Sequence, residues 1–357
     1  MKSIQFSHPG TPSEVLTCVE SERPKPGQGE VIVRMLASPI NPSDLMFVRG
    51  QYTIPTSSPG FPGFEGVGVV DESGGGLRGR LMAGRRVVVL NRTGGNWAEY
   101  AVVRSDSVIP VSRGLSDEQA ATFFVNPATA WIMSQEVLCV PRGEWLVQTA
   151  AASSVGQMIV RLGKKQGFRT FSIVRRAEQA ALLQRLGADR VVVFDGARDS
   201  PEMLRQAVRD ALGVAGIRFA IDAVGGATGS AVAQFLGPGG HLLVYGTLSG
   251  SPLEISSRAL MTVGSRIEGF WLGQYMSRAT LWFRLRLVRR LTGLIQGGVL
   301  NSQIRQSFPL QEIGQAAAAA EQLQDSGKIL LRMSSNCGRS GTELTSAIPE
   351  DCRKATG

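Results

Sequence analysis

The sequence predicts an α/β protein in which a doubly wound parallel sheet is joined to a second, β-rich domain. Three observations predict it. From about residue 145, apolar strand-like runs alternate with helical segments, which is typical of a parallel sheet with helices on both faces. Before about residue 120, short β-branched segments are instead separated by Pro/Gly clusters. A chain of 357 residues is also too long for one ordinary core and fits two domains.

The first part of the chain is rich in strands and turns. The stretch 58–70 is dense in Gly and Pro before its apolar run, so we expect a loop that leads into a strand. β-branched or alternating character predicts strands near 2–7, 30–37, 65–71, 86–90 and 98–103.

The later part alternates between helix and strand. Residues 118–136 are expected to form a helix. The strands that follow are nearly all apolar, as expected when both faces of a sheet are covered. They are predicted at 145–150, 170–174, 190–194, 218–224 and 241–246, with helices over 155–166, 177–186, 201–212 and 228–236.

The last part predicts helices over about 278–297 and 311–325 and a closing strand at 328–333. Residues 334–357 are polar and aperiodic, which predicts a disordered tail. We therefore assign residues 1–122 and 270–333 to the β-rich domain and residues 123–269 to the parallel-sheet domain.

Composition narrows the class of protein. No apolar stretch approaches the length of a bilayer span, so an integral membrane protein is not expected. The amino terminus lacks both a secretory signal core and a transit helix. The four cysteines are far apart and form no CxxC pair, which indicates reduced thiols and a cytoplasmic location.

A formal net charge of +9 is compatible with binding to nucleic acid. The sequence contains no zinc-finger spacing, no RNP-like aromatic pattern and no basic tail, so no nucleic-acid partner is predicted. Binding of polyanionic small molecules, such as phosphorylated cofactors and acyl-CoA, explains the charge equally well.

The first strand-to-helix turn of the alternating region reads AAASSVGQ, residues 150–157. In a dinucleotide fold, glycines at this turn let the backbone approach a pyrophosphate at a helix amino terminus. Here Ala151 and Ser153 replace the first two glycines of a GxGxxG pattern, and only Gly156 remains. The motif alone is weak, but it begins the first of several strand–helix units.

The end of the second strand is more informative. An NAD enzyme usually places an acid there, whereas NADP requires positive charge for the 2′-phosphate. This chain has Arg175 and Arg176 and no acid before Glu178. Guanidinium groups match phosphate geometry, so we predict NADPH. The alternative is two exposed arginines that begin a helix.

Neither histidine predicts a metal site. His8 and His241 are the only two in the chain, and neither has Cys or acidic neighbours at ligand spacing. No metal is therefore predicted. The scarcity of histidine also disfavours a Ser-His-Asp hydrolase, and no GxSxG elbow is present.

Several motifs together resemble the zinc-independent medium-chain dehydrogenases/reductases, most closely the mitochondrial-type trans-2-enoyl-thioester reductases of fatty acid synthesis. The resemblance covers about residues 1–333 and implies a Rossmann domain beside a GroES-like catalytic domain. NPSDLMFVRGQY (41–52) and GFWLGQY (269–275) discriminate best, because general quinone reductases usually lack them. The other landmarks are GFEGVGVV (63–70), FFVNPATAW (123–131), SSVGQ (153–157), VGG (224–226), YGTL (245–248) and GKILLRM (327–333).

The resemblance implies the roles of individual residues. Tyr52 would be the catalytic tyrosine, and Tyr245 to Leu248 with Phe270 to Gly273 would line the nicotinamide and acyl pocket. The departures at the SSVG turn, Thr247 and Gly273 leave the acyl preference open. The cofactor-binding residues would be Asn126, Ala152, Ser153, Ser154, Val155, Gly156, Arg175, Arg176, Tyr245, Gly246, Thr247, Leu248, Phe270, Trp271, Leu272, Gly273 and Lys328.

The expected chemistry is reduction of the double bond of a 2-enoyl thioester, carried by CoA or an acyl-carrier protein. Hydride addition to the β-carbon places negative charge on the thioester oxygen, which donors must stabilise. A phenol of pKa about 10 stays protonated at neutral pH, so Tyr52 could donate a hydrogen bond or the proton. Alternatively, Tyr52 is a packed loop tyrosine, and Phe270 and Trp271 are core aromatics.

The sequence is also compatible with other functions. The chain could reduce a quinone, an enal or an enone with NADPH, or bind the cofactor without catalysis. The arginines between Arg284 and Arg290 form either the solvated face of a helix or a surface that attracts CoA phosphates or an acyl-carrier protein. The resemblance implies a homodimer formed by edge-to-edge extension of the Rossmann sheets.

Overall fold

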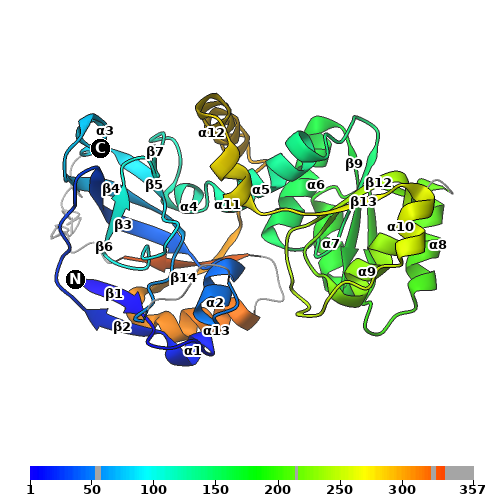
Figure 1. Cartoon of the computed structure of the whole chain (residues 1–357), viewed down its shortest axis with the longest axis horizontal. Coiled ribbons are helices and arrows are strands. Elements are labelled where there is room, and N and C mark those ends of the chain that lie inside the picture. The colour runs from blue at the N-terminus through cyan, green and yellow to red at the C-terminus, as the bar shows by residue number, and fades with distance from the viewer. Residues whose placement is uncertain (53–57, 214–215, 323–326, 334–357) are drawn as a thin grey trace, which may run out of the picture.

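Two β-sheets organise the chain, one in each lobe of an elongated molecule (Figure 1). The computed structural model describes residues 1–52, 58–213, 216–322 and 327–333. The predicted disordered tail, 334–357, lies outside the described residues. Among the described helices, none has both the length and the apolar character needed to cross a bilayer.

The sheet of one lobe is parallel throughout and has the strand order β10-β9-β8-β11-β12-β13. This is the doubly wound order predicted by the alternation of strands and helices. The strands are β8 (Trp145–Gln148), β9 (Arg169–Val174), β10 (Arg190–Val193), β11 (Ile217–Asp222), β12 (Leu236–Val244) and β13 (Arg266–Gly269). The helices between them are α6 (Ser154–Gln166), α7 (Ala177–Arg185), α8 (Pro201–Leu212), α9 (Gly226–Gln234) and α10 (Ser257–Val263).

Both faces of the parallel sheet are covered, as its apolar strands predict. Successive side chains of a strand point to opposite faces. Leu146 of β8 packs in one core with Ile159 of α6, whereas Val147 packs in another with Leu204 of α8 and Val232 of α9. Because both faces of such a strand are buried, nearly all of its side chains are apolar, and the sequence of these segments is a continuous apolar run.

The second lobe is built around a seven-stranded sheet, mostly antiparallel, in the order β14-β15-β3-β4-β5-β7, with β6 paired to β3. The predicted early strands are confirmed, and residues near the carboxyl end of the chain return to the same sheet. Its strands are β3 (Glu30–Pro39), β4 (Glu65–Ser73), β5 (Arg86–Leu90), β6 (Tyr100–Arg104), β7 (Val108–Pro110), β14 (Ile304–Pro309) and β15 (Lys328–Arg332). Next to it lie the β1 (Lys2–Gln5) and β2 (Thr17–Glu20) hairpin and the helices α1 (Pro12–Val15), α2 (Pro42–Val48), α3 (Leu77–Met82) and α13 (Ile313–Gln322), preceded by the 3₁₀ turn η2 (Leu310–Glu312).

The prediction of a single helix over 118–136 is wrong. The segment forms α4 (Asp117–Ala121), α5 (Val125–Trp131) and a π-helical turn, η1 (Ile132–Val137). A contact with a distant part of the chain causes the break, because the Glu65 carboxylate accepts hydrogen bonds from the backbone N–H groups of Phe124, at 2.5 Å, and Val125, at 2.9 Å. Those N–H groups are therefore not available to continue α4, and a new helix begins at Val125.

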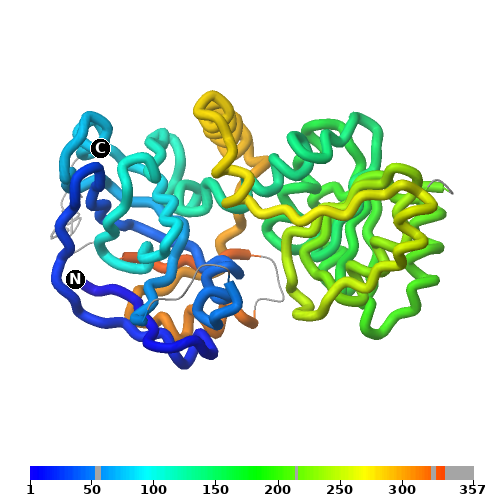
Figure 2. The backbone as a smooth tube through the Cα atoms, in the orientation of Figure 1, coloured from blue at the N-terminus to red at the C-terminus, as the bar shows by residue number. Residues whose placement is uncertain are grey.

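The helix expected over about 278–297 is confirmed as α12 (Leu281–Gln296), and a short helix that was not predicted, α11 (Leu272–Arg278), precedes it. Thr280 caps α12, because its hydroxyl accepts a hydrogen bond from the Phe283 N–H at 3.3 Å. Figure 2 shows the chain leaving the parallel sheet after β13, crossing back to the gap between the lobes and rising into α12.

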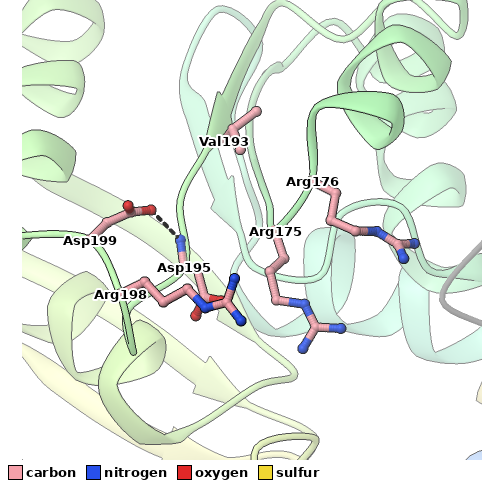
Figure 3. A pocket seen from close by; sticks show the side chains of 6 residues that line it. All are labelled: Arg175, Arg176, Val193, Asp195, Arg198 and Asp199. Carbon is pink, nitrogen blue, oxygen red and sulfur yellow. Dashed lines mark hydrogen bonds and ion pairs between the residues drawn. The ribbon is translucent and has the colours of Figure 1, made fainter.

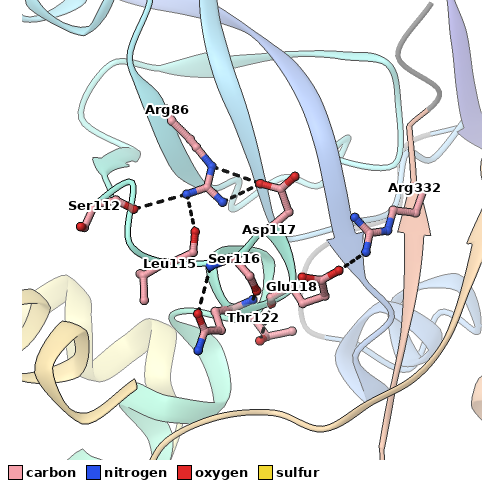
Figure 4. Close-up of polar contacts among 9 residues, drawn as sticks. Arg86, Ser112, Leu115, Ser116, Asp117, Glu118, Thr122 and Arg332 are labelled. Carbon is pink, nitrogen blue, oxygen red and sulfur yellow. Dashed lines mark hydrogen bonds and ion pairs between the residues drawn. The ribbon is translucent and has the colours of Figure 1, made fainter. Parts of the chain in front are cut away.

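Helix α4 is fixed to the seven-stranded sheet by two arginines (Figure 4). Arg86 of β5 pairs with Asp117, with 2.5 Å between Nη2 and Oδ1, and also donates to the Leu115 carbonyl at 3.0 Å. Arg332 of β15 pairs with Glu118. The chain therefore leaves the lobe of the seven-stranded sheet from a fixed point.

One hydrophobic core passes through both lobes. It joins Val67 and Leu330 of the seven-stranded sheet to Leu146 and Ile221 of the parallel sheet, and the helices α5 and α12 lie between them. Because this core is shared, the relative position of the lobes is fixed by packing and not only by the connecting segments.

Candidate active site

The turn between β8 and α6 has the features of an anion-binding turn. Ser153 is the N-cap of α6, and its hydroxyl accepts a hydrogen bond from the Gly156 N–H at 3.2 Å. A Cβ on Gly156 would lie 2.3 Å from the Ala151 carbonyl oxygen, so only glycine allows helix and turn to approach this closely. This 13-residue helix begins just after β8, so its amino terminus lies at the carboxyl end of a parallel strand, where anions are bound in such folds.

Tyr245 contributes a buried hydroxyl to the same region. It follows β12, its N–H donates to the Asp222 carbonyl at 2.8 Å, and its ring joins the core beneath α6. Burial, and then the nearby Asp222, raise the pKa of the Tyr245 hydroxyl, while the Ser153 side chain acts in the opposite direction. Within the described part of the chain, this hydroxyl makes no hydrogen bond. A protonated, buried donor beside a helix amino terminus fits a phosphate-bearing cofactor that supplies the missing acceptor.

The arginines that follow β9 lie at a pocket of about 540 Å³. Figure 3 shows Arg175 and Arg198 reaching toward the same opening, while Arg176 points away from Arg198. Asp195 also lines the pocket, but one of its oxygens accepts from the Ala197 N–H at 3.1 Å and the other lies 3.9 Å from Arg198 Nε. Asp199 accepts from the Asp195 N–H at 2.7 Å. The acids therefore organise the loop, and the arginines give the opening its positive charge.

Tyr52 and Trp271, predicted from separate motifs, are in contact. Their ring centroids lie 5.3 Å apart, and the Tyr52 ring also packs on Phe64 at 5.5 Å. Burial raises the pKa of the Tyr52 hydroxyl, hydrogen bonding with the Trp271 side chain lowers it, and Asp44 raises it. The phenol is half-buried and stays protonated at neutral pH, so it is available as a donor at the gap between the lobes.

A buried polar network beneath Tyr52 was missed by sequence reasoning. Asp44 accepts hydrogen bonds from the Asn41 N–H at 2.7 Å and the Phe64 N–H at 3.1 Å. Lys328, at the start of β15, donates to the Asn41 side-chain oxygen. Glu65, the residue after Phe64, holds the amino terminus of α5. The four polar residues of this network, Asn41, Asp44, Glu65 and Lys328, are all buried.

The charges of the network depend on one another. Burial raises the pKa of both Asp44 and Glu65 to about 7, against the lowering effect of the N–H donors and Lys328. Burial lowers the pKa of Lys328 to about 8, against the raising effect of Glu65 and Asp44. The network supports the Tyr52 ring through Phe64 and supports Asn126, the second residue of α5, through Glu65. Lys328, predicted as a cofactor contact, is thus engaged with protein groups.

Lys328→Met is expected to destabilise the protein by about 3–5 kcal/mol at about pH 8, because it leaves two buried carboxylates without their cation. Without the ammonium, the pKa values of Asp44 and Glu65 in the folded state rise further above the unfolded values of about 4. A carboxyl group whose pKa is higher in the folded state than in the unfolded state stabilises the fold at low pH, and this stabilisation is lost as the pH rises. The loss of unfolding free energy caused by Lys328→Met should therefore be smaller at about pH 5 than at about pH 8.

Urea unfolding of Lys328→Met at both pH values measures this effect. The matched control is Lys164→Met, which removes an exposed ion pair with Asp189 and should cost less than about 1 kcal/mol at either pH. An equal penalty for Lys328→Met at both pH values would show that the carboxylates do not depend on the ammonium.

The remaining predicted residues lie around these features. Phe270 is buried against Tyr275, and Leu272 and Gly273 begin α11. A Cβ on Gly246 would lie 2.7 Å from the Ala223 carbonyl oxygen. Ala152 and Val155 are buried in the α6 turn, Ser154 is half-buried there, and Thr247 and Leu248 are exposed after β12.

No metal centre is formed by the described residues, which contain no close group of three His, Cys, Asp or Glu side chains. His241 instead lies 3.2 Å from Glu268 at the edge of the parallel sheet. Cys18 and Cys139 are free thiols, whereas Cys337 and Cys352 lie outside the described residues.

Comparisons with known proteins agree with this architecture. The model of the alcohol dehydrogenase GroES-like domain matches residues 27–113, and the model of the zinc-binding dehydrogenase matches residues 154–285. The mitochondrial enoyl-[acyl-carrier-protein] reductase of Bos taurus is 31% identical over 337 residues, which cover 93% of this chain and 89% of the relative. The chain belongs to the medium-chain dehydrogenase/reductase family.

Solved structures of quinone oxidoreductases have the same fold as this medium-chain dehydrogenase/reductase. A putative NADPH:quinone reductase from Bacillus thuringiensis has a TM-score of 0.84 and 30% identity, over 93% of this chain and 99% of that chain. A quinone oxidoreductase of Escherichia coli, complexed with NADPH, has a TM-score of 0.83 and 25% identity, over 93% and 100%. The predicted Rossmann and GroES-like fold class is confirmed, and the chain is an oxidoreductase of a nicotinamide-dependent family.

Proposed function

We propose that this chain reduces the α,β double bond of a 2-enoyl thioester, enoyl-CoA or enoyl-acyl-carrier protein, with NADPH. The observation that carries the proposal is the contact of Tyr52 with Trp271. It joins a protonated phenol of the GroES-like lobe to the segment that follows the Rossmann sheet. The bovine relative, which is named for this activity, supports the substrate class.

NADPH is supported by two features of the chain. Arg175, Arg176 and Arg198 give positive charge where the 2′-phosphate of NADP is bound in this fold. The α6 turn, with Ser153, Ser154 and Gly156 among its residues, would receive the pyrophosphate. Tyr245 to Leu248 and Phe270 to Gly273 would line the nicotinamide and acyl pocket.

The proposed chemistry assigns a proton to Tyr52. When bound, the reduced cofactor supplies the hydride that adds to the β-carbon of the enoyl group. Tyr52 donates a hydrogen bond to the thioester oxygen, where negative charge develops, or supplies the proton that the α-carbon gains. The raised pKa of Tyr52 keeps this donor protonated across the neutral range. Phe64 and Trp271 pack on the Tyr52 ring and hold it in place.

Reduction of a quinone or a free enal or enone is the second candidate. The similarity to the Bacillus thuringiensis structure, titled a putative NADPH:quinone reductase, favours it. This reaction would use the same cofactor site, but it would not require a pocket shaped for an acyl chain. A cofactor-binding role without catalysis is the third candidate, and two features argue against it: the phenol of Tyr52 beside Trp271 and the arginine-lined pocket after β9.

An acceptor panel tests these candidates. NADPH oxidation is followed with crotonyl-CoA, a longer enoyl-CoA, a quinone and an enal. Turnover of the thioesters with little turnover of the quinone is the expected result. Turnover of quinones alone would replace the proposal with the second candidate, and NADPH binding without any turnover would favour the third.

Assembly and location complete the proposal. Strand β13 is one of the two edge strands of the parallel sheet, so pairing with the same strand of a second copy would give a homodimer with a continuous sheet. The cysteine pattern indicates a cytoplasmic location, whereas the bovine relative is named mitochondrial. Turnover of the thioesters in the acceptor panel would support a role in fatty acid metabolism.

A further inference from the structure

A small pocket of about 210 Å³ lies between α12 and the segment formed by α5 and η1. Its walls combine guanidinium groups with aromatic rings. Arg290 lies over the Trp131 ring, at 5.1 Å, and Arg286 lies over the Phe283 ring, at 5.4 Å. Glu136 and Leu287 complete the lining.

The pocket carries an excess of positive charge. Glu136, the acid in its lining, accepts from Trp131 Nε1 at 3.0 Å and lies 3.4 Å from Arg286 Nη2. Among the described residues, Arg290 has no acidic partner. A guanidinium that stacks on a ring keeps its N–H edge open, and this edge matches a phosphate group in a bidentate manner. The pocket therefore has the chemistry of a phosphate site.

A row of aromatic contacts connects this pocket to the candidate active site. Tyr52 touches Trp271, and the neighbouring Phe270 packs on Tyr275 at 5.9 Å. Tyr275 in turn packs on Phe283 at 5.8 Å, and Phe283 lines the pocket. Two sets of ring contacts, joined by the chain link between Trp271 and Phe270, thus lead along α11 from Tyr52 to α12.

An exposed tryptophan stands beside the pocket. Trp282 is 82% exposed and lies one helical turn before Arg286 on α12. Residues four apart on a helix are neighbours on its surface. A flat ring next to two guanidiniums suits a nucleotide base that bears phosphates, because bases stack on aromatic side chains.

We propose that the Arg286–Arg290 pocket binds the phosphorylated nucleotide end of a coenzyme A thioester. The inference rests on the proposed function, and it adds the carrier and its place of binding. The arginines hold the phosphates, Trp282 stacks on the adenine, and the pantetheine arm follows α11 to Tyr52. A concave pocket of this size suits a phosphate group better than the convex face of a carrier protein.

The site can be tested without turnover. The probe is adenosine 3′,5′-bisphosphate, titrated calorimetrically with the cofactor site saturated by NADP⁺. We expect the double variant Arg286→Gln, Arg290→Gln to bind the probe about tenfold or more weakly, because charge-assisted hydrogen bonds to phosphate are lost. The matched control is Arg258→Gln, Arg289→Gln, which removes the same charge from exposed positions of α10 and α12 that do not line the pocket, and it should bind within about twofold of wild type.

Kinetics then separate this site from the reaction itself. The double variant should raise KM for crotonyl-CoA about tenfold or more, with kcat and the KM for crotonyl-pantetheine within about twofold of wild type. Equal effects on both thioesters, or equal effects in the control variant, would overturn the proposal. So would an effect confined to carrier-protein substrates, or a change of oligomeric state in the double variant.

Failure of the proposed function looks different. In that case wild-type protein would turn over neither thioester, while the probe titration would still report whether the pocket binds the nucleotide. Thermal unfolding of each variant within a few degrees of wild type establishes that the arginine changes leave the fold intact.

Discussion

Tyr52→Phe is expected to lower kcat for crotonyl-CoA about 10²- to 10³-fold while changing the Kd for NADPH less than about twofold. The change removes one hydroxyl and keeps the ring that packs on Phe64 and Trp271. Because the hydroxyl is proposed to act where charge develops in the transition state, its loss should affect turnover and not cofactor binding.

The control is Tyr100→Phe, which removes a phenol hydroxyl from β6, where Arg23 lies over the ring at 4.6 Å. It should leave kcat within about twofold. Steady-state kinetics and a fluorescence titration of NADPH measure the two quantities. Parallel losses of kcat and NADPH affinity in Tyr52→Phe would mean that the residue holds structure and does not donate in the reaction.

The pH dependence of kcat gives the Tyr52 assignment an independent check. Burial raises the pKa of Tyr52, so the donor form should persist to pH values above about 10. No fall in kcat from this group is therefore expected between about pH 7 and 9, and the alkaline limb should be absent from Tyr52→Phe.

The double variant Arg175→Ala, Arg176→Ala should weaken NADPH binding about 10²-fold and NADH binding less than about threefold. The guanidiniums are proposed to contact only the 2′-phosphate, a group that NADH lacks, and charge-assisted pairs of this kind are the strong ones. Arg198, on the opposite side of the pocket, should retain part of the preference. Calorimetric titration with both cofactors measures the ratio.

The matched control for the cofactor prediction is Arg185→Ala, Arg209→Ala, which removes two exposed helix arginines of the same lobe. It lowers the net charge by the same amount, so it separates a local contact from a general electrostatic effect. If both double variants shift the NADPH to NADH ratio equally, Arg175 and Arg176 do not recognise the 2′-phosphate.

The sequence alone predicted much of the fold and part of the candidate site. Strand–helix alternation predicted the parallel sheet, because a strand covered on both faces is apolar at every position. The glycine of the α6 turn and the arginine pair after β9 were also readable, since each is tied to a fixed place in a repeating unit. These features are local, and local patterns report burial and backbone conformation directly.

Only the tertiary structure decided the rest. No sequence pattern singled out Asp44 or Glu65, yet both are buried in the core together with Lys328, which was predicted as a cofactor contact. The contact of Glu65 with the start of α5 ended the predicted helix early. Tyr52 meets Trp271, and Arg175 shares a pocket with Arg198, because the lobes and loops pack in one particular way. Such contacts join distant segments, and no local period records them.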